Sequence, residues 1–365
     1  MYNSTLKKPN GQEYLIQKDD IDDITNSNEM ETIRKRFLAG TQPRGCHRCW
    51  MEELSGKKSK RVRDNQKYQH HIKDNVIFAE QQKPRYLDLK LGNICNLKCR
   101  ICSPQYSSRW ITEQKRYDKI DGIQNDYSRL DWPEKSEHFW ETIESVMPHL
   151  EHLDFTGGEP FMIKEHFALL EKIIDGGYAK NITLHYNSNG TQLPLPALKN
   201  IWPNFKYVDV HFSIDGIDKK FEYQRHPAKW QDAISNMSVF KEYQTPTFDL
   251  CICHTVNIFN VFYLPEFLDW TKKFGMKVYL NNLHEPKHYN ITCLPYGVKL
   301  IIKQKLEEYK GINLNNVINF MMSGDNVQHF KQFQHHTTRT DIVRHETFDK
   351  VFPELSTMFQ GVIIA

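Results

Sequence analysis

The sequence lacks the features of exported and membrane-spanning proteins. Its N-terminus has no apolar segment of the kind found in secretory signals, and no window approaches the ~18 apolar residues of a membrane span. The net charge of +3 at pH 7 is too small to argue for nucleic-acid binding by itself. We also find no internal repeat and no strongly biased tract. These absences favour a soluble cytoplasmic protein with no membrane contact, and they give no support to a nucleic-acid partner.

The composition is that of an ordinary globular chain. Its 365 residues can form one barrel-sized α/β domain and a smaller appendage. Apolar residues make up 39% and charged residues 25%, which are usual values for soluble proteins. The eight cysteines are grouped at metal-type spacings, and the chain has no export signal. This favours a reducing compartment over a disulfide scaffold.

Three of these cysteines form the most informative motif. Cys95, Cys99 and Cys102 have the spacing C-x3-C-x2-C, with no fourth cysteine close by. Four ligands are needed to close a [4Fe–4S] cluster, so three thiolates leave one iron open to a group that is not protein. The alternative is a four-cysteine zinc site that combines Cys99 and Cys102 with Cys46 and Cys49. Residues 50–98 separate these pairs, far more than the roughly 15–20 residues of a zinc ribbon, and Cys95 would have no role.

Together with Ile101 just before the third cysteine, this spacing resembles the signature of the radical S-adenosylmethionine (SAM) superfamily. The resemblance implies a [4Fe–4S] cluster whose open iron is chelated by the amino and carboxylate groups of SAM. One electron from the cluster would cleave SAM to methionine and a 5′-deoxyadenosyl radical, which abstracts a hydrogen atom from a substrate. An electron donor such as flavodoxin or ferredoxin is also implied.

From residue 86 onward, apolar strands alternate with amphipathic helices, a pattern that builds a parallel sheet covered by helices. Six strands are fewer than the eight of a closed barrel, so we expect an α/β fold with a partial (β/α)6 barrel of the radical SAM type. We expect a core at 86–295, a small N-terminal region at 1–85 and a helical C-terminal extension at 296–365. The expected strands are Tyr86–Gly92, His152–Thr156, Ile182–Asn187, Tyr207–Ser213, Phe248–Val256 and Lys277–Asn281.

Polar motifs follow the expected strands. Gly157, Gly158 and Glu159, followed by Pro160, come directly after the second strand. Paired glycines let the backbone approach a ligand closely. In the radical SAM superfamily this stretch contacts the amino group of the methionine moiety, which implies the same contact here. An ordinary loop is the alternative.

The ends of the next strands carry further candidates for SAM binding. Asn189, Ser213 and Asp215 resemble the residues that line the ribose and carboxylate of SAM in related enzymes, although Asn-Gly and Asp-Gly are also common turns. Arg225 could pair with the SAM carboxylate, or it could be a surface arginine. Asn257 at the end of the fifth strand is a candidate for contact with the substrate or adenine.

The N-terminal region resembles that of twitch-domain radical SAM proteins, which carry one auxiliary Fe–S cluster. The residues that carry this likeness are Ile33-Arg34-Lys35-Arg36, Gly40 and Cys46-x2-Cys49-Trp50-x-Glu52-Glu53, with Tyr223-x-Arg225-x-Pro227, Leu264-Pro265-Glu266-Phe267, Leu294-Pro295 and Phe352-Pro353-Glu354-Leu355 further on. The resemblance implies that Cys46 and Cys49 are ligands of an auxiliary cluster. A redox pair and half a zinc site remain alternatives.

Residues 1–45 contain no cysteine, whereas the family usually has further cysteines upstream. Either the sequence starts later than those of the family, or an auxiliary cluster must recruit other thiols. Cys251, Cys253 and Cys293 are the ones left, and such residues are more often small buried strand residues.

Other features of the sequence have simpler interpretations. Asn28 and Glu31 resemble a capping box that opens a helix, and Gly40 is expected to end it. The basic run that follows is expected to be a solvated face, with an anion contact as the alternative; it comprises Lys57, Lys58, Lys60, Arg61 and Arg63. Four histidines in the polar C-terminal region fit no ordinary metal motif and are expected at the surface: His329, His335, His336 and His345.

Family members with auxiliary clusters often modify peptides or small metabolites, so the resemblance favours a peptide substrate. One alternative is the radical modification of a nucleotide or nucleic acid. Another is a non-catalytic Fe–S or zinc binding protein that keeps the fold as an interaction module.

Overall fold

The computed structural model describes residues 5–54, 58–73, 82–324 and 326–363. Within these ranges no helix is both long and apolar enough to cross a lipid bilayer. The α-helices are α1 (Ile21–Thr25), α2 (Asn28–Leu38), α3 (His47–Leu54), α4 (Lys60–Lys67), α5 (His70–Lys73), α6 (Ile111–Asp121), α7 (Glu137–Glu144), α8 (Lys164–Asp175), α9 (Asp218–Gln224), α10 (Trp230–Glu242), α11 (Leu264–Phe274), α12 (Tyr296–Glu308), α13 (Asn315–Met322), α14 (Phe330–Arg344), α15 (Phe348–Val351) and α16 (Pro353–Ile363).

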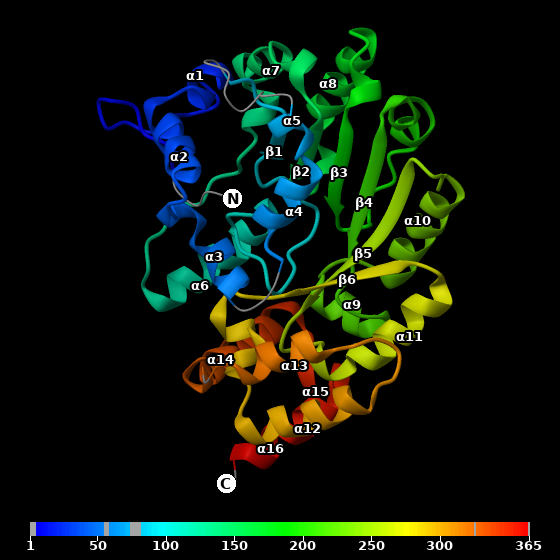
Figure 1. The fold of residues 1–365 in the computed structure, drawn as a ribbon. Helices are drawn as coiled ribbons and strands as arrows, with labels where there is room; N and C mark the ends of the chain where they lie inside the picture. Colours follow the sequence, from blue (N-terminus) through cyan, green and yellow to red (C-terminus); the bar gives the residue numbers. More distant parts are fainter. Residues whose placement is uncertain (1–4, 55–57, 74–81, 325, 364–365) are drawn as a thin grey trace.

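One parallel sheet of six strands forms the centre of the molecule (Figure 1). Its spatial order β1-β2-β3-β4-β5-β6 is the order of the strands in the sequence, and helical segments connect them. The prediction of an α/β fold with six parallel strands is therefore confirmed. The strands are β1 (Tyr86–Lys90), β2 (His152–Thr156), β3 (Thr183–Ser188), β4 (Tyr207–Ser213), β5 (Phe248–Val256) and β6 (Lys277–Asn282).

The two faces of the sheet differ in polarity because side chains alternate along each strand. Leu153, Leu184 and Val210 on the outer face are fully buried, in one core with Ile143 of α7 and Leu170 of α8. These positions belong to the apolar patterns from which the strands and helices were predicted.

The inner face of the sheet is polar. His185 of β3 lies opposite Asp209 of β4, and His211 follows on the same face two residues later. All three side chains are partly exposed. Closed parallel barrels usually fill this space with branched apolar side chains. Here the inner face presents hydrogen-bonding groups instead.

The first long helix begins one residue earlier than the sequence predicts. Ser27 is the N-cap: it has extended backbone angles, and its hydroxyl accepts a bond from the backbone N–H of Met30 at 3.4 Å. Asn28 is already helical, so the predicted capping box is wrong. Gly40 follows the C-cap at a φ of +72°, as expected for a glycine that ends a helix.

Helix α4 brings part of the basic run to the sheet. Lys60 Nζ lies 2.5 Å from the Tyr86 hydroxyl of β1 and over its ring. The predicted solvated face is therefore wrong for Lys60, although Lys58 and Arg63 are exposed as expected. Lys57 lies outside the described residues.

The C-terminal helices α12–α16 gather at the end of the sheet where the strands finish (Figure 1). Phe259, which follows β5, contacts Phe333 of α14 at 5.3 Å and Phe352 at 5.8 Å between ring centroids. This aromatic cluster attaches the helical C-terminal residues to the strand ends.

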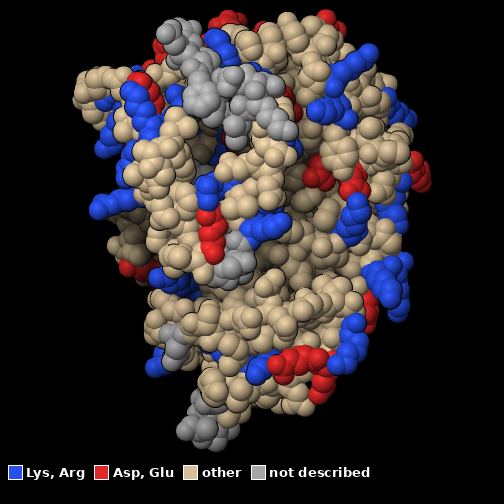
Figure 2. Space-filling view, viewed as in Figure 1, with Lys and Arg blue, Asp and Glu red and all other residues tan. Residues whose placement is uncertain are grey.

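Charged side chains of both signs are scattered over the face of the molecule that Figure 2 shows. No extended patch of one sign covers the described residues on that face. This distribution agrees with the small net charge of +3.

Candidate functional site

The three cysteines of the motif lie on the loop between β1 and α6 and face one cavity. This cavity has a volume of about 330 Å³ and is lined by Cys95, Cys99 and Cys102 together with residues from the ends of β2, β3 and β4. All eight cysteines of the chain are free thiols, and the other five do not line this cavity. The volume lies at the lower end of the range for small-molecule sites.

The protein environment keeps these thiols neutral. Burial raises the pKa of Cys95 and of Cys102 to about 12, and the neighbouring Cys99 adds to both shifts. Burial also raises the pKa of Cys99, while Arg225, whose Nη1 lies 3.9 Å from the Cys99 sulfur, acts in the opposite direction. Binding of a metal must therefore displace protons from all three sulfurs.

Gly157 and Gly158 bring the end of β2 against the backbone of the cysteine loop. The N–H of Gly158 donates to the carbonyl of Gly92 at 3.1 Å, and the N–H of Glu159 donates to that of Ile94 at 2.7 Å. A Cβ on Gly158 would lie 2.0 Å from the Ile94 carbonyl oxygen, and Gly157 has a φ of +115°. Both glycines line the cavity. They also allow two backbone segments to pack directly on each other.

Glu159 lies behind the cavity and is only 1% exposed. Its carboxylate accepts bonds from the backbone N–H of Asn189 at 2.7 Å and from the hydroxyl of Ser188 at 2.9 Å. Glu159 therefore holds the end of β3 in place. The cavity lining does not include Glu159, so its contact with SAM stays a prediction.

The ionisation of Glu159 makes stability depend on pH. Burial raises its pKa to about 7, although bonds from Asn189 and Ser188 act in the opposite direction. The ordinary pKa of this group is 4.5. Glu159 therefore contributes fully to the unfolding free energy below pH 4.5, and this contribution is lost as the pH rises through 7. The total loss is roughly 3 kcal/mol. We expect the unfolding free energy of the metal-free protein to fall between about pH 5 and pH 8, and to fall less in Glu159→Gln. Urea unfolding at both pH values measures this; equal losses in the two proteins would contradict it.

Asn189 connects the end of β3 to the cysteine loop. Its Nδ2 donates to Oδ1 of Asn96 at 2.9 Å and lies 3.8 Å from the sulfur of Cys95. Its Oδ1 accepts from the N–H of Thr191 at 2.9 Å. Asn189 lines the cavity, as the sequence predicts for a residue that binds the cofactor.

Arg225 and Ser213 also line the cavity, but Asp215 does not. Nη2 of Arg225 lies 2.6 Å from Oδ2 of Asp215. Asp215 is 1% exposed, and its Oδ1 accepts from the N–H of Thr255 at 2.9 Å. Nε of Arg225 is buried and has no partner among the described residues. This unpaired donor beside the cysteines can bind an anionic group.

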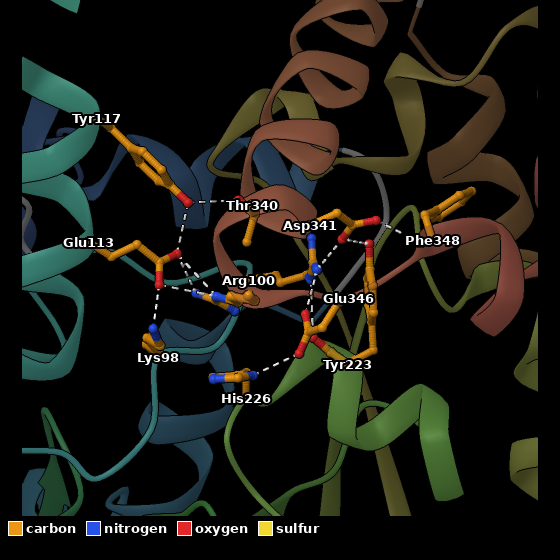
Figure 3. Close-up of polar contacts among 11 residues, drawn as sticks. Lys98, Arg100, Glu113, Tyr117, Tyr223, His226, Thr340, Asp341, Glu346 and Phe348 are labelled. Carbon is orange, nitrogen blue, oxygen red and sulfur yellow. Dashed lines mark hydrogen bonds and ion pairs between the residues drawn. The ribbon is translucent and has the colours of Figure 1, made fainter. Parts of the chain in front are cut away.

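A second layer of charged groups attaches the cysteine loop to the C-terminal helices (Figure 3). The side chain of Arg100 is fully buried; it lies over the ring of Tyr223 and pairs with Asp341 of α14 and with Glu346 at 2.6 Å. Asp341 also accepts from the backbone N–H of Phe348 at 2.6 Å. Arg100 and Asp341, which are 241 positions apart in the sequence, thus attach the cysteine loop to α14.

Glu113 of α6 is the centre of the other half of this network (Figure 3). Its carboxylate pairs with Lys98 of the loop and with Arg344 at 3.0 Å, and it accepts from the Tyr117 hydroxyl at 2.9 Å. The Tyr117 hydroxyl in turn accepts from that of Thr340 at 3.4 Å. Lys98 and Arg100, on either side of Cys99, are therefore both fixed by ion pairs.

Removing the Arg100 charge should destabilise this arrangement. We expect Arg100→Met to lower the unfolding free energy by about 3 kcal/mol, because the carboxylates of Asp341 and Glu346, only 14% and 19% exposed, lose the cation that they share. Lys172→Met, which removes a more exposed ion pair with Glu144, should cost less than about 1 kcal/mol. Chemical denaturation compares the two variants, and equal losses would contradict the role given to Arg100.

Cys46 and Cys49 lie apart from this cavity lining. Each is 5% exposed, Cys46 in a short 3-10 helix and Cys49 in α3. Burial raises the pKa of Cys46, and the adjacent Cys49 adds to the shift. Their role as ligands of an auxiliary cluster stays a prediction.

Other sequence predictions can be placed directly. Asn257 is fully buried, and its Nδ2 donates to Oε1 of Gln224 at 3.2 Å, so its contact with the substrate or adenine stays a prediction. His335 and His345 are exposed as predicted. His336 is only partly exposed and stacks on His288.

Several residues of the cavity were not proposed individually from the sequence. Thr156, Asn187 and Ser188 line it at the ends of β2 and β3, and Tyr106 and Ser107 line it after the cysteine loop. Thr156 and Asn187 could have been found from strand alternation, because each is the last inward-facing residue of its strand.

One family model and several solved structures are similar to this chain. The sequence model of the Radical SAM superfamily matches residues 89–269. No curated protein matches the chain. Among solved structures, native anSMEcpe with bound AdoMet is 21% identical, with coverage of 61% of this chain and 58% of that chain and a TM-score of 0.45. Native anSMEcpe with bound AdoMet and Cp18Cys peptide is 19% identical, with coverage of 61% and 58% and a TM-score of 0.43. This chain thus covers less than two thirds of the length of anSMEcpe.

Proposed function

We propose, from the match of residues 89–269 to the sequence model of the Radical SAM superfamily, that this chain is a radical SAM enzyme that cleaves SAM reductively and abstracts a hydrogen atom from a substrate. The observation that carries the proposal is the arrangement of the cysteines. Three thiols face one cavity that no other cysteine lines, and polar groups from three neighbouring strand ends complete it. This donor set fits a [4Fe–4S] cluster with one open iron.

Cys95, Cys99 and Cys102 would hold the cluster. When bound, the cluster and SAM supply one-electron cleavage to methionine and a 5′-deoxyadenosyl radical. Nε of Arg225 would donate to the SAM carboxylate, with its guanidinium held by Asp215. Asn189 would contact the ribose while it stays attached to the cysteine loop.

The remaining parts of the chain would enclose this core. We propose that residues 86–295 form the catalytic unit, a partial (β/α)6 barrel, and that residues 296–365 and the twitch-like region 1–85 exclude water from it. A peptide is the substrate class that the family resemblance favours. The electron donor, flavodoxin or ferredoxin, and a cytoplasmic location also remain predictions from the sequence.

Anaerobic reconstitution with iron and sulfide tests the proposal. The reconstituted protein, given dithionite and SAM, should produce methionine and 5′-deoxyadenosine in equal amounts. A colourless, zinc-loaded protein without SAM cleavage would instead indicate a non-catalytic zinc-binding protein that keeps the fold as an interaction module. Deuterium transfer into 5′-deoxyadenosine from labelled peptides would then identify the substrate.

The auxiliary cluster has a separate test. We expect Cys46→Ala to lower the iron content by about two to four atoms per chain, the content of one cluster, because the variant loses a ligand of that cluster. SAM cleavage should continue, because Cys46 does not line the SAM cavity. Iron and sulfide analysis of the purified protein gives the answer, and an unchanged iron content would remove the auxiliary site from the account.

A further inference from the structure

A second group of metal-ligand side chains lies on the inner face of the sheet. His185 of β3 lies opposite Asp209 of β4, and His211 is two residues further along β4. The pleat therefore directs all three side chains to the same side. None of them lines the cysteine cavity or takes part in the proposed SAM site.

The three side chains have the spacing that one bound ion requires. Nδ1 of His185 lies 2.9 Å from Oδ2 of Asp209, and Nε2 of His211 lies 3.2 Å from Oδ1 of the same carboxylate. One ligand atom from each residue can be chosen so that all lie within 4.8 Å of one another. Ligands bound at about 2.1 Å, at angles of 90–110°, are roughly 3.0–3.4 Å apart. A small displacement of the side chains would thus admit an ion.

A neighbouring amide can fix the required form of His185. Nε2 of His185 lies 3.1 Å from the side-chain amide of Asn187. With the amide oxygen turned toward the ring, Nε2–H donates to it, and the lone pair of Nδ1 points to the Asp209 side. Metal-bound histidines are usually oriented by such a contact. Asn187 also lines the cysteine cavity, so the two sites are adjacent.

A nearby pair on the same sheet shows what a purely structural contact looks like. His152 Nε2 lies 2.6 Å from Asp154, but Lys67 Nζ lies 3.2 Å from the other ring nitrogen. The Tyr86 hydroxyl occupies the second oxygen of Asp154. The polar atoms of His152 and Asp154 are therefore all paired within the protein, and the Lys67 ammonium occupies the place of a metal cation. The side chains of His185, Asp209 and His211, in contrast, are 19–24% exposed.

We propose that His185, Asp209 and His211 bind one divalent transition-metal ion, such as Fe²⁺, Co²⁺ or Zn²⁺. Two imidazoles and one carboxylate select these ions over Mg²⁺ and Ca²⁺, which prefer all-oxygen ligands. Three protein ligands leave coordination positions open toward the inner face, where water or an oxygen of a bound molecule can complete the shell.

Cobalt binding to the reconstituted protein tests the site independently of SAM cleavage. We expect equilibrium dialysis against Co²⁺ to load one cobalt per chain, with weak visible bands and no intense sulfur-to-cobalt band. His185→Ala and His211→Ala should weaken binding at least about 100-fold, which is more than the loss of a supporting contact costs. His152→Ala, which removes the histidine paired with Asp154, should bind like the wild type.

The isosteric variant Asp209→Asn covers the case in which an alanine variant fails to fold. Loss of cobalt from a folded Asp209→Asn protein, judged by its thermal melt, would support the site. Absence of cobalt from the wild type, or equal cobalt binding by wild type, His185→Ala and Asp209→Asn, would overturn the proposal. Neither result depends on whether the chain cleaves SAM.

Discussion

Replacing Cys99 with alanine should abolish both the iron–sulfur cluster and the cleavage of SAM. Cys99 lies between the other two cysteines and faces the same cavity, so its loss leaves two thiolates where the cluster needs three. We expect the reconstituted variant to lack cluster absorbance and to form methionine and 5′-deoxyadenosine no faster than protein-free buffer. Absorbance spectra and product analysis after reconstitution measure both effects.

Cys293→Ala provides the matched control. Cys293 is fully buried but does not line the cavity. Its replacement should cost about 1 kcal/mol of stability and should leave the cluster and SAM cleavage intact. Cleavage by Cys99→Ala at the wild-type rate would show that the cluster ligands are assigned incorrectly.

Gly158→Ala should prevent the cysteine loop from packing on the sheet. The added Cβ would lie 2.0 Å from the carbonyl oxygen of Ile94 and 2.8 Å from its nitrogen. Both contacts are with backbone, so two segments must separate. We expect a loss of at least about 4–5 kcal/mol in unfolding free energy, and a variant that does not retain iron. Denaturant unfolding and iron analysis measure these effects.

Gly297→Ala is the control for the added methyl group. Gly297 lies in α12, and a Cβ there would meet no atom within 4 Å. Alanine should raise stability by about 0.5–1 kcal/mol, because it loses less backbone entropy in a helix. Equal stability of the Gly158→Ala and Gly297→Ala proteins would show that the backbone of Gly158 does not pack closely against Ile94 of the cysteine loop.

The sheet could be predicted well because its strands follow simple patterns. Val208, Val210 and Phe212 alternate with polar residues, and the observed strand β4 has the predicted bounds, Tyr207–Ser213. Both faces of the sheet follow from this alternation. The cysteine motif predicted one site at the strand ends, and the structure brings Cys95, Cys99 and Cys102 to it.

The depth of each polar residue could not be predicted. Glu159 and Asp215 belong to motifs that were expected to bind SAM. Neither side chain lines the cavity, and they hold Asn189 and Arg225 in place instead. Which residue of a turn faces a ligand depends on backbone angles that a motif does not specify. The sequence gives only the order of these residues along the chain.

Contacts between distant segments were also not predictable. Arg100 pairs with Asp341 across 241 residues, and no local pattern connects them. Lys60 belongs to a basic run that is usually solvated, but α4 places it on Tyr86. Both contacts depend on how helices pack around the sheet.

Electron–nuclear double resonance on the reduced cluster measures directly whether SAM completes the cluster. The reconstituted protein would be reduced in the presence of SAM labelled with ¹⁵N in its amino group. The account predicts a hyperfine coupling that shows this nitrogen bound to iron, with Cys95, Cys99 and Cys102 as the protein ligands. A cluster without this coupling, or with a fourth protein ligand on that iron, would contradict it.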